Sequence, residues 1–191
     1  MTQCQRCNGT GKLIAAGHPL TCSNCVGPLK YAGVGSRDTP STVCTTMSNL
    51  ALQLALRGWV LRSGNAKGRT PPKPDTGSAD LAFANGCKMV RGRSVIRVAT
   101  DWQPALDHAA QYHPNWSACD DRARALHARN SQVMLGDWFD DPVKFVLCWT
   151  VGGGIKGGTG QALRIAEAYN IPVFNLALVS VDAFWSWFDD Q

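Results

Sequence analysis

Glutamate is nearly absent from this chain of 191 residues, which contains only Glu167. Carboxylate chemistry anywhere else must therefore come from aspartate. The sequence also lacks an apolar run of the ~20 residues that a membrane-spanning helix needs, and its polar N-terminus has no hydrophobic signal-peptide region. We therefore expect a cytoplasmic protein without a membrane partner.

Acidic side chains are missing from the first 30 residues, which contain Arg6, Lys12 and Lys30, and the whole chain has a net charge of +5. A basic segment suits contact with nucleic acid or another anionic partner. A solubilising surface explains the same charge, and acidic pairs such as Asp120 and Asp121 interrupt any continuous basic face. The charge alone leaves both interpretations open.

Cysteine is present as two close pairs near the N-terminus. The pairs are Cys4 with Cys7 and Cys22 with Cys25. Two Cys-x-x-Cys pairs can complete a closed tetrahedral site, so we predict a structural Zn²⁺ bound by all four thiolates. A redox or disulfide pair is the alternative, which an intracellular location disfavours. The segment CQRCNGTG resembles the repeated module of DnaJ-type zinc domains, and the resemblance extends to the metal-binding turn only.

Two domains are predicted. Residues 1–28 are too few to bury a core, so metal would have to hold that module together. From residue 29 to residue 191, short apolar runs alternate with helical patterns, which predicts an α/β domain with a Rossmann-like parallel sheet of about five strands. The expected strands are 29–34, 59–63, 94–99, 144–150 and 172–176, and the expected helices are 42–57, 78–85, 103–112, 120–135, 159–170 and 181–188.

Glycine-bearing turns follow three of the expected strands. Each can present backbone amides to a phosphate at the carboxyl edge of the sheet, where ligands of such sheets bind. The candidate ligand-binding residues in these turns are Gly33, Gly35, Ser36 and Arg37 in the first, Ser63 and Gly64 in the second, and Gly153, Gly154, Gly157, Gly158, Thr159, Gly160 and Gln161 in the third.

Four segments together resemble the SLOG superfamily, which includes the DNA-processing protein DprA, the lonely-guy phosphoribohydrolases and small phage-encoded DprA-like proteins. They are YAGVGSRDTP, LRSGNAKG with ADLAFANG, LHARNSQVM and GGTGQALRIAEAYNIPVFNL, within about residues 30–178. The resemblance is strongest to the phage relatives. It implies a nucleotide or a nucleotide-derived ligand at the glycine-rich turns, and the cytoplasm of a host cell as the location.

The resemblance to lonely-guy enzymes is incomplete at the catalytic carboxylate. LHARNSQVM matches much of their Met-His-x-Arg-Lys-x-x-Met motif, which makes Arg129 the candidate to hold a phosphate. Their catalytic glutamate corresponds to Ala162, and Glu167 lies about 12 Å beyond Thr159 along the expected helix. If the chain hydrolyses an N-glycosidic bond, Asp80 and Asp101 are the candidates to replace that carboxylate, beside Arg129.

Three functions fit these features. The first is binding of a nucleotide or nucleotide-derived small molecule, the second is phosphoribohydrolase activity, and the third is binding of single-stranded DNA by a DprA-like module. The proline-rich segment 67–77 is expected to be an exposed insertion, serving as a lid, as a partner-binding arm or as neither. A homo-oligomer is expected, because lonely-guy relatives often complete their sites across a dimer, and the apolar helix at 181–188 could supply an interface or close the core.

Overall fold

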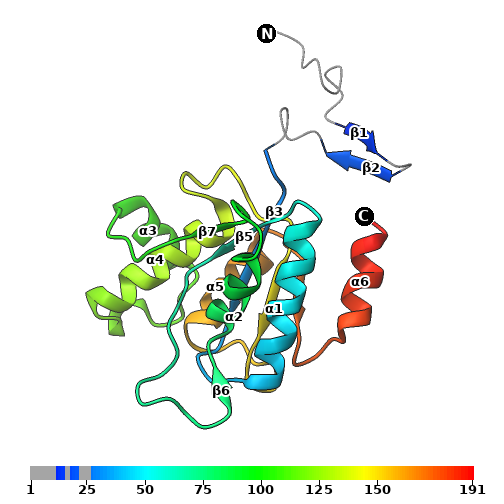
Figure 1. The fold of residues 1–191 in the computed structure, drawn as a ribbon. Helices are drawn as coiled ribbons and strands as arrows, with labels where there is room; N and C mark the ends of the chain where they lie inside the picture. Colours follow the sequence, from blue (N-terminus) through cyan, green and yellow to red (C-terminus); the bar gives the residue numbers. More distant parts are fainter. Residues whose placement is uncertain (1–11, 16–17, 22–26) are drawn as a thin grey trace, which may run out of the picture.

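The computed structural model describes residues 12–15, 18–21 and 27–191, and its centre is a five-stranded parallel sheet (Figure 1). The strand order is β7-β5-β3-β8-β9, and every neighbouring pair is parallel. The predicted α/β class and parallel sheet are therefore confirmed. The strands are β3 (Lys30–Gly35), β5 (Val60–Ser63), β7 (Ser94–Ile96), β8 (Val146–Trp149) and β9 (Val173–Asn175).

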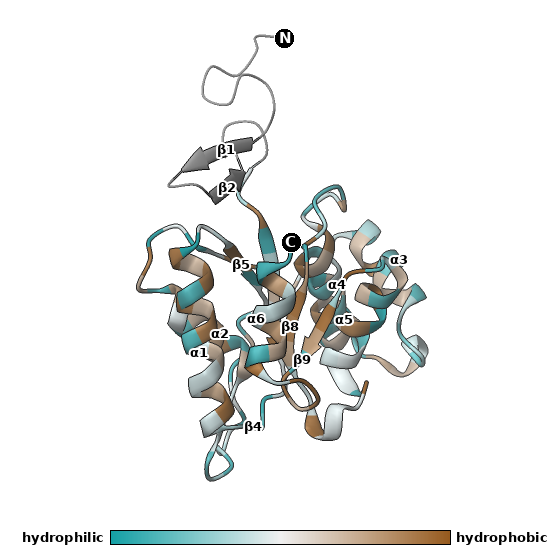
Figure 2. Cartoon of the chain, turned by 90° about the vertical axis from the view of Figure 1, so that its right-hand side faces the viewer, coloured by the Kyte–Doolittle hydropathy of each residue, from teal (hydrophilic) through white to brown (hydrophobic). Residues whose placement is uncertain are grey.

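Helices cover both faces of the sheet, as Figure 2 shows from the side. One face carries α1 (Ser41–Leu56), α2 (Ala79–Cys87) and α6 (Val181–Asp189). The other carries α4 (Asp121–Leu135) and α5 (Gly157–Ala168), with α3 (Gln103–Gln111) packed on α4. Two short 3-10 turns complete the helical segments, η1 (Trp116–Ala118) and η2 (Val151–Gly153).

Alternation along the strands explains the two apolar cores. Successive side chains of a strand point to opposite faces. Tyr31 of β3 accordingly joins the cluster under α1, α2 and α6, whereas Ala32 joins the cluster under α4 and α5. In β8, Leu147 likewise joins the first cluster and Cys148 the second. Burial raises the pKa of the Cys148 thiol to about 12, which keeps it an unreactive core group.

The C-terminal helix α6 closes the first core. Phe184 is fully buried against Phe145 and Phe174, and Trp187 and Phe188 pack around it. Two roles were expected for this apolar helix, an oligomer interface or closure of the core. Its most buried face closes the core.

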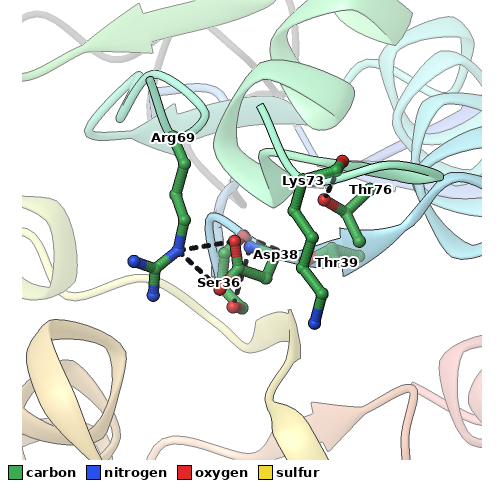
Figure 3. A network of polar contacts seen from close by, with 6 residues as sticks. All are labelled: Ser36, Asp38, Thr39, Arg69, Lys73 and Thr76. Carbon is green, nitrogen blue, oxygen red and sulfur yellow. Dashed lines mark hydrogen bonds and ion pairs between the residues drawn. The ribbon is translucent and has the colours of Figure 1, made fainter. Parts of the chain in front are cut away.

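The insertion at 67–77 is tied back to the turn that follows β3 (Figure 3). Arg69 Nε lies 2.7 Å from the Asp38 carboxylate, and the bridge is largely exposed on the arginine side. Next to it, β4 (Thr39–Pro40) pairs antiparallel with β6 (Thr76–Gly77). Residues near both ends of this segment therefore contact the chain that follows β3.

The N-terminal module lies mostly outside the described residues. Within it, β1 (Lys12–Ala15) pairs antiparallel with β2 (His18–Thr21). Cys4, Cys7, Cys22 and Cys25, which we predict to bind zinc, all lie outside the described residues. In the part of the chain that the structure describes, each helix is too short or too polar to cross a membrane.

Candidate functional site

The reversal of strand order places the candidate site between β3 and β8. The chain leaves β3 toward β5 and β7 on one side, and returns through β8 and β9 on the other. Gly35 at the end of β3 is in register with Trp149 at the end of β8, and Ser36 N–H donates to the Trp149 carbonyl at 3.1 Å. In open parallel sheets of this kind, ligands bind beyond this point.

The first glycine turn contains one packing glycine and one glycine at the site edge. A Cβ on Gly33 would lie 2.6 Å from Leu61 Cδ1 and 2.7 Å from Phe83 Cγ, so Gly33 belongs to the core under α2. A Cβ on Gly35 would lie 2.6 Å from Ala79 Cβ and 2.8 Å from the Trp149 carbonyl oxygen. Glycine at position 35 therefore lets α2 begin close against the ends of two strands.

Arg129 of α4 lies directly over Gly64, at the end of β5. A side chain on Gly64 would overlap the guanidinium group, so the arginine occupies the space that the glycine leaves free. Arg129 is only 7% exposed, and its Nε has a long hydrogen bond of 3.5 Å to the Leu126 carbonyl. Within the described residues, neither Nη atom has a hydrogen-bond acceptor and no carboxylate lies within ion-pair distance.

Asp80, in the first turn of α2, shares this site. Its Oδ2 accepts a hydrogen bond of 3.0 Å from Ala66 N–H, in the turn that follows β5. Ser78 caps the same helix end and donates to the Ala66 carbonyl. Burial raises the pKa of Asp80, and hydrogen bonds from Ala66 and Gly35 together with the charge of Arg129 partly oppose that shift. The structure thus brings together two of the three predicted catalytic residues.

The third predicted catalytic residue lies in the segment between β7 and α3. Asp101 is exposed in the segment that precedes α3, next to Thr100, whose N–H donates to the Ala125 carbonyl of α4. Its neighbour Trp102 packs against Trp138 and Phe139. In the described part of the chain, no hydrogen bond or ion pair joins Asp101 to Arg129 or Asp80.

The loop after β8 is held in place by side chains of the next strand and its following turn. Asn175 Nδ2 donates to Thr150 Oγ1 at 2.7 Å, and Thr150 N–H donates back to the Asn175 Oδ1 at 3.3 Å. Gly153 has a φ of 74°, and a Cβ there would lie 2.6 Å from Leu178 Cδ2. Gly154 follows in extended backbone. The glycines of this loop therefore serve its tight path.

The remaining glycines form the first turn of α5, because the helix begins at Gly157 rather than at Thr159. The backbone N–H groups of a first helical turn have no partner within the helix. Cβ positions on Gly157 and Gly158 would meet open space, and Thr159 is half-buried. Gly160 differs, since its Cβ would lie 2.6 Å from the Ile155 backbone. This helix end is thus open to a ligand at two residues.

Asn130 connects Arg129's helix to this open helix end. Its Nδ2 donates to the Gly158 carbonyl and to Gln161 Oε1, each at 3.0 Å. Gln161 is fully buried and serves this contact. Of the other predicted ligand-binding residues, Ser63 is buried, Ser36 Oγ accepts from Asp38 N–H at 3.0 Å, and Arg37 is exposed.

A second group of polar side chains, which the sequence pattern did not indicate, could hold a metal ion. His113, Cys119 and His127 each offer a ligand atom, and these atoms lie within 4.8 Å of one another. His113 and Cys119 are half-buried, and His127 is buried. The sequence does place two histidines and a cysteine within 15 residues. Their spacing matches no common metal-binding motif, and no sequence pattern predicts that the connection between them folds back.

A hollow of about 190 Å³ lies at the opposite, amino-terminal edge of the sheet. Lys30, Asp141 and Lys144 are among its lining residues, and Lys30 and Arg62 both form ion pairs with Asp141. Ligand sites usually occupy about 300–1,000 Å³. We therefore assign the candidate site to the carboxyl edge, where the chemically distinctive residues meet.

The fold and the arrangement of its loops define a Rossmann-like α/β protein with a buried arginine and aspartate at the switch point of its sheet. Comparison of the chain with protein-family models, curated proteins and solved structures gave no match.

Proposed function

We propose that the protein binds a nucleotide or nucleotide-derived small molecule at the carboxyl ends of β3, β5 and β8. The observation that carries this proposal is Arg129, a buried guanidinium whose two Nη atoms have no acceptor within the described residues. Burial lowers the pKa of Arg129, and the nearby Asp80 opposes this shift only in part, because the two side chains form no ion pair within 4 Å. A phosphate bound at the site would supply both the acceptors and the opposite charge.

The beginning of α5 supplies the second half of a phosphate site. Its open first turn offers backbone N–H groups and the positive end of the helix dipole. Asn130 holds this turn next to the helix that carries Arg129. The residues proposed to contact ligand are therefore Arg129, the amides of Gly157 and Gly158, and the Thr159 hydroxyl.

The resemblance to the SLOG superfamily supports the same location. The segments that carry it contribute Gly35, Gly64, Asp80, Arg129 and Gly158. These residues come from distant parts of the sequence and lie around one edge of the sheet. This shared location is what we expect if the resemblance reflects a common ligand site.

Isothermal titration calorimetry with AMP, GMP, CMP and UMP tests the proposal. Arg129→Met should weaken binding of the tightest probe about 10- to 100-fold, the range expected for a lost charged hydrogen bond. Arg122→Met is the matched control, because Arg122 is an exposed residue of the same helix. Absence of binding by the unmodified protein, or equal affinity in both variants, would reject the site for these ligands.

The position of Asp80 favours a second candidate function, hydrolysis of the N-glycosidic bond of a nucleoside monophosphate. A buried carboxyl with a raised pKa is suited to general acid–base work, and Asp80 lies beside the proposed phosphate-binding arginine. Incubation with the same four nucleotides should release free base, and Asp80→Asn should abolish release while retaining binding. If the unmodified protein binds these nucleotides but releases no free base, it binds them without hydrolysing them, and the second candidate function is rejected for these substrates.

The N-terminal cysteines extend the proposal to a metal and to a second kind of ligand. We propose that Cys4, Cys7, Cys22 and Cys25 hold a structural Zn²⁺, on their spacing. The basic charge of this module is compatible with single-stranded DNA as an alternative ligand of the whole chain. Binding of that kind would weaken steeply as salt is raised, because bound phosphates release counterions, and salt-insensitive binding would argue against it.

A further inference from the structure

We propose that His113, Cys119 and His127 form a second metal site, specific for Zn²⁺ or a similar transition metal, with three protein ligands. It is separate from the four N-terminal cysteines and does not depend on the proposed nucleotide site. The three residues come from the segment after α3, the residue after η1 and the second turn of α4. A bound metal would fasten the α3–α4 connection to α4.

The distances are close to those of a tetrahedral site. Cys119 Sγ lies 3.7 Å from both Nδ1 and Nε2 of His113. Tetrahedral Zn²⁺ with ordinary Zn–S and Zn–N bonds separates sulfur from nitrogen by about 3.6 Å. The His113 and His127 rings have centroids 4.4 Å apart, and one ligand atom of each residue falls within the 4.8 Å group. Because the sulfur is equidistant from both nitrogens of the His113 ring, that ring must rotate to direct one nitrogen toward a centre shared with Cys119 and His127.

Unpaired nitrogen in a buried position is the second observation. His127 is 8% exposed, and its buried Nδ1 has no hydrogen bond of ordinary geometry in the described part of the chain. Burial lowers the pKa of His127, and the Gln161 side chain, whose Nε2 is also unpaired among the described residues, lies close enough to oppose that shift in part. Buried polar atoms are normally paired, so each exception needs an explanation. The polar contacts of His113 are long, a hydrogen bond of 3.3 Å from Asn115 N–H to its Nδ1 and the 3.7 Å approaches of Cys119 Sγ. Metal binding would give both rings a strong partner.

The donor set selects the kind of metal. Two imidazoles and one thiolate suit Zn²⁺ and related ions, whereas Ca²⁺ and Mg²⁺ require oxygen ligands. No carboxylate of the described residues belongs to the group. The nearby cations include Arg124, over the Trp116 ring at 5.8 Å, and Arg129 and Arg164, which face His127. Cys119 as thiolate therefore supplies the negative charge, and water takes the fourth position, as in open zinc sites.

Metal binding should be measured on the full-length chain with Cys4, Cys7, Cys22 and Cys25 all replaced by serine, so that only the new site remains. We expect one Co²⁺ per chain, with a thiolate-to-cobalt charge-transfer band in the near ultraviolet and the strong visible bands of four-coordinate cobalt. Competition with Zn²⁺ should remove both. Absence of a one-to-one complex, or six-coordinate spectra without the thiolate band, would overturn the proposal.

Ligand variants in the same background identify the site. Cys119→Ser and His113→Gln should each weaken Zn²⁺ binding by about 100-fold or more, since even residues that only support ligands cost 10- to 100-fold. Cys44→Ser is the matched control, because Cys44 is another half-buried free thiol and should leave affinity unchanged. Urea unfolding verifies that each variant folds. Undiminished affinity in a folded Cys119→Ser or His113→Gln variant would refute the assignment.

Discussion

At the scale of single residues, the carboxyl edge of the sheet is distinguished by two charged groups that are buried close together without forming an ion pair within 4 Å. Asp80 accepts hydrogen bonds from backbone N–H groups. The Arg129 guanidinium lies in the space that the missing side chain of Gly64 leaves free. The sequence motifs identified both residues. They also singled out Asp101, which is exposed and, among the described residues, forms no hydrogen bond or ion pair with either of them. Positions at strand ends look alike in a sequence pattern until the loops are placed.

The pH dependence of stability should report the burial of Asp80. A carboxyl whose pKa is raised on folding favours the folded state below its unfolded value of 3.8, and this contribution is lost as pH rises through the raised pKa. The unfolding free energy of the unmodified protein minus that of Asp80→Asn should therefore fall with rising pH and then level off. Urea unfolding across the acidic and neutral range measures this difference. Asp190→Asn, at an exposed carboxylate, is the control, and a difference that rises with pH would contradict the assignment.

Gly64→Ala tests whether the arginine needs the space above the strand end. The new methyl group would overlap the Arg129 guanidinium, which is the mobile end of a long side chain and must move away. We expect nucleotide affinity to fall about tenfold or more, as for loss of a charged hydrogen bond, with a smaller effect on stability. Gly68→Ala is the control in the same connection, where a Cβ meets nothing within 4 Å. Equal nucleotide affinities in the two variants would show that Arg129 does not contribute to ligand binding from this position.

At the scale of elements, apolar periodicity predicted all five strands of the parallel sheet and the six helices to within a few residues, but not the two-residue strands β4 and β6. The start of α5 was predicted at Thr159 and lies at Gly157. Glycine weakens helix interiors, so the pattern favoured a loop there, yet Asn130 and the close approach of Gly160 to Ile155 hold the glycines in the first helical turn. Tertiary contacts of this kind are invisible to local propensity.

Gly33 illustrates the same limit within a strand, and its substitution makes a clear prediction. We grouped Gly33 with the ligand-binding glycines, while the structure places it against Leu61 and Phe83 of the core. Gly33→Ala should lower the free energy of unfolding by about 1–3 kcal/mol, the usual cost of overpacking a core. Chemical denaturation measures this, with Gly68→Ala again as the control. A variant of unchanged stability would show that the neighbouring side chains can move aside freely.

At the scale of the whole molecule, the chain order of the strands sets where the candidate site lies, because the order reverses between β3 and β8 and ligands of such sheets bind beyond that point. The parallel sheet could be predicted from alternating strand and helix patterns. The convergence of His113, Cys119 and His127 could not, because it depends on how one irregular connection folds back on α4. Long-range closure of short loops has no periodic signature in a sequence.

The predicted division of the chain into a small N-terminal module and an α/β domain leads to the last prediction. All described members of the two apolar cores lie between Tyr31 and Phe188, and the first backbone contact with the sheet is from Val60 N–H to the Leu29 carbonyl. A chain that begins at Gly27 should therefore unfold in one cooperative step. Its unfolding free energy should remain within about 1 kcal/mol of the full-length value, because it keeps every buried apolar group of those cores. Urea unfolding followed by tryptophan fluorescence measures both quantities. Loss of cooperativity in the shortened chain, with the full-length protein as control, would show that the N-terminal module is part of one folding unit with the sheet.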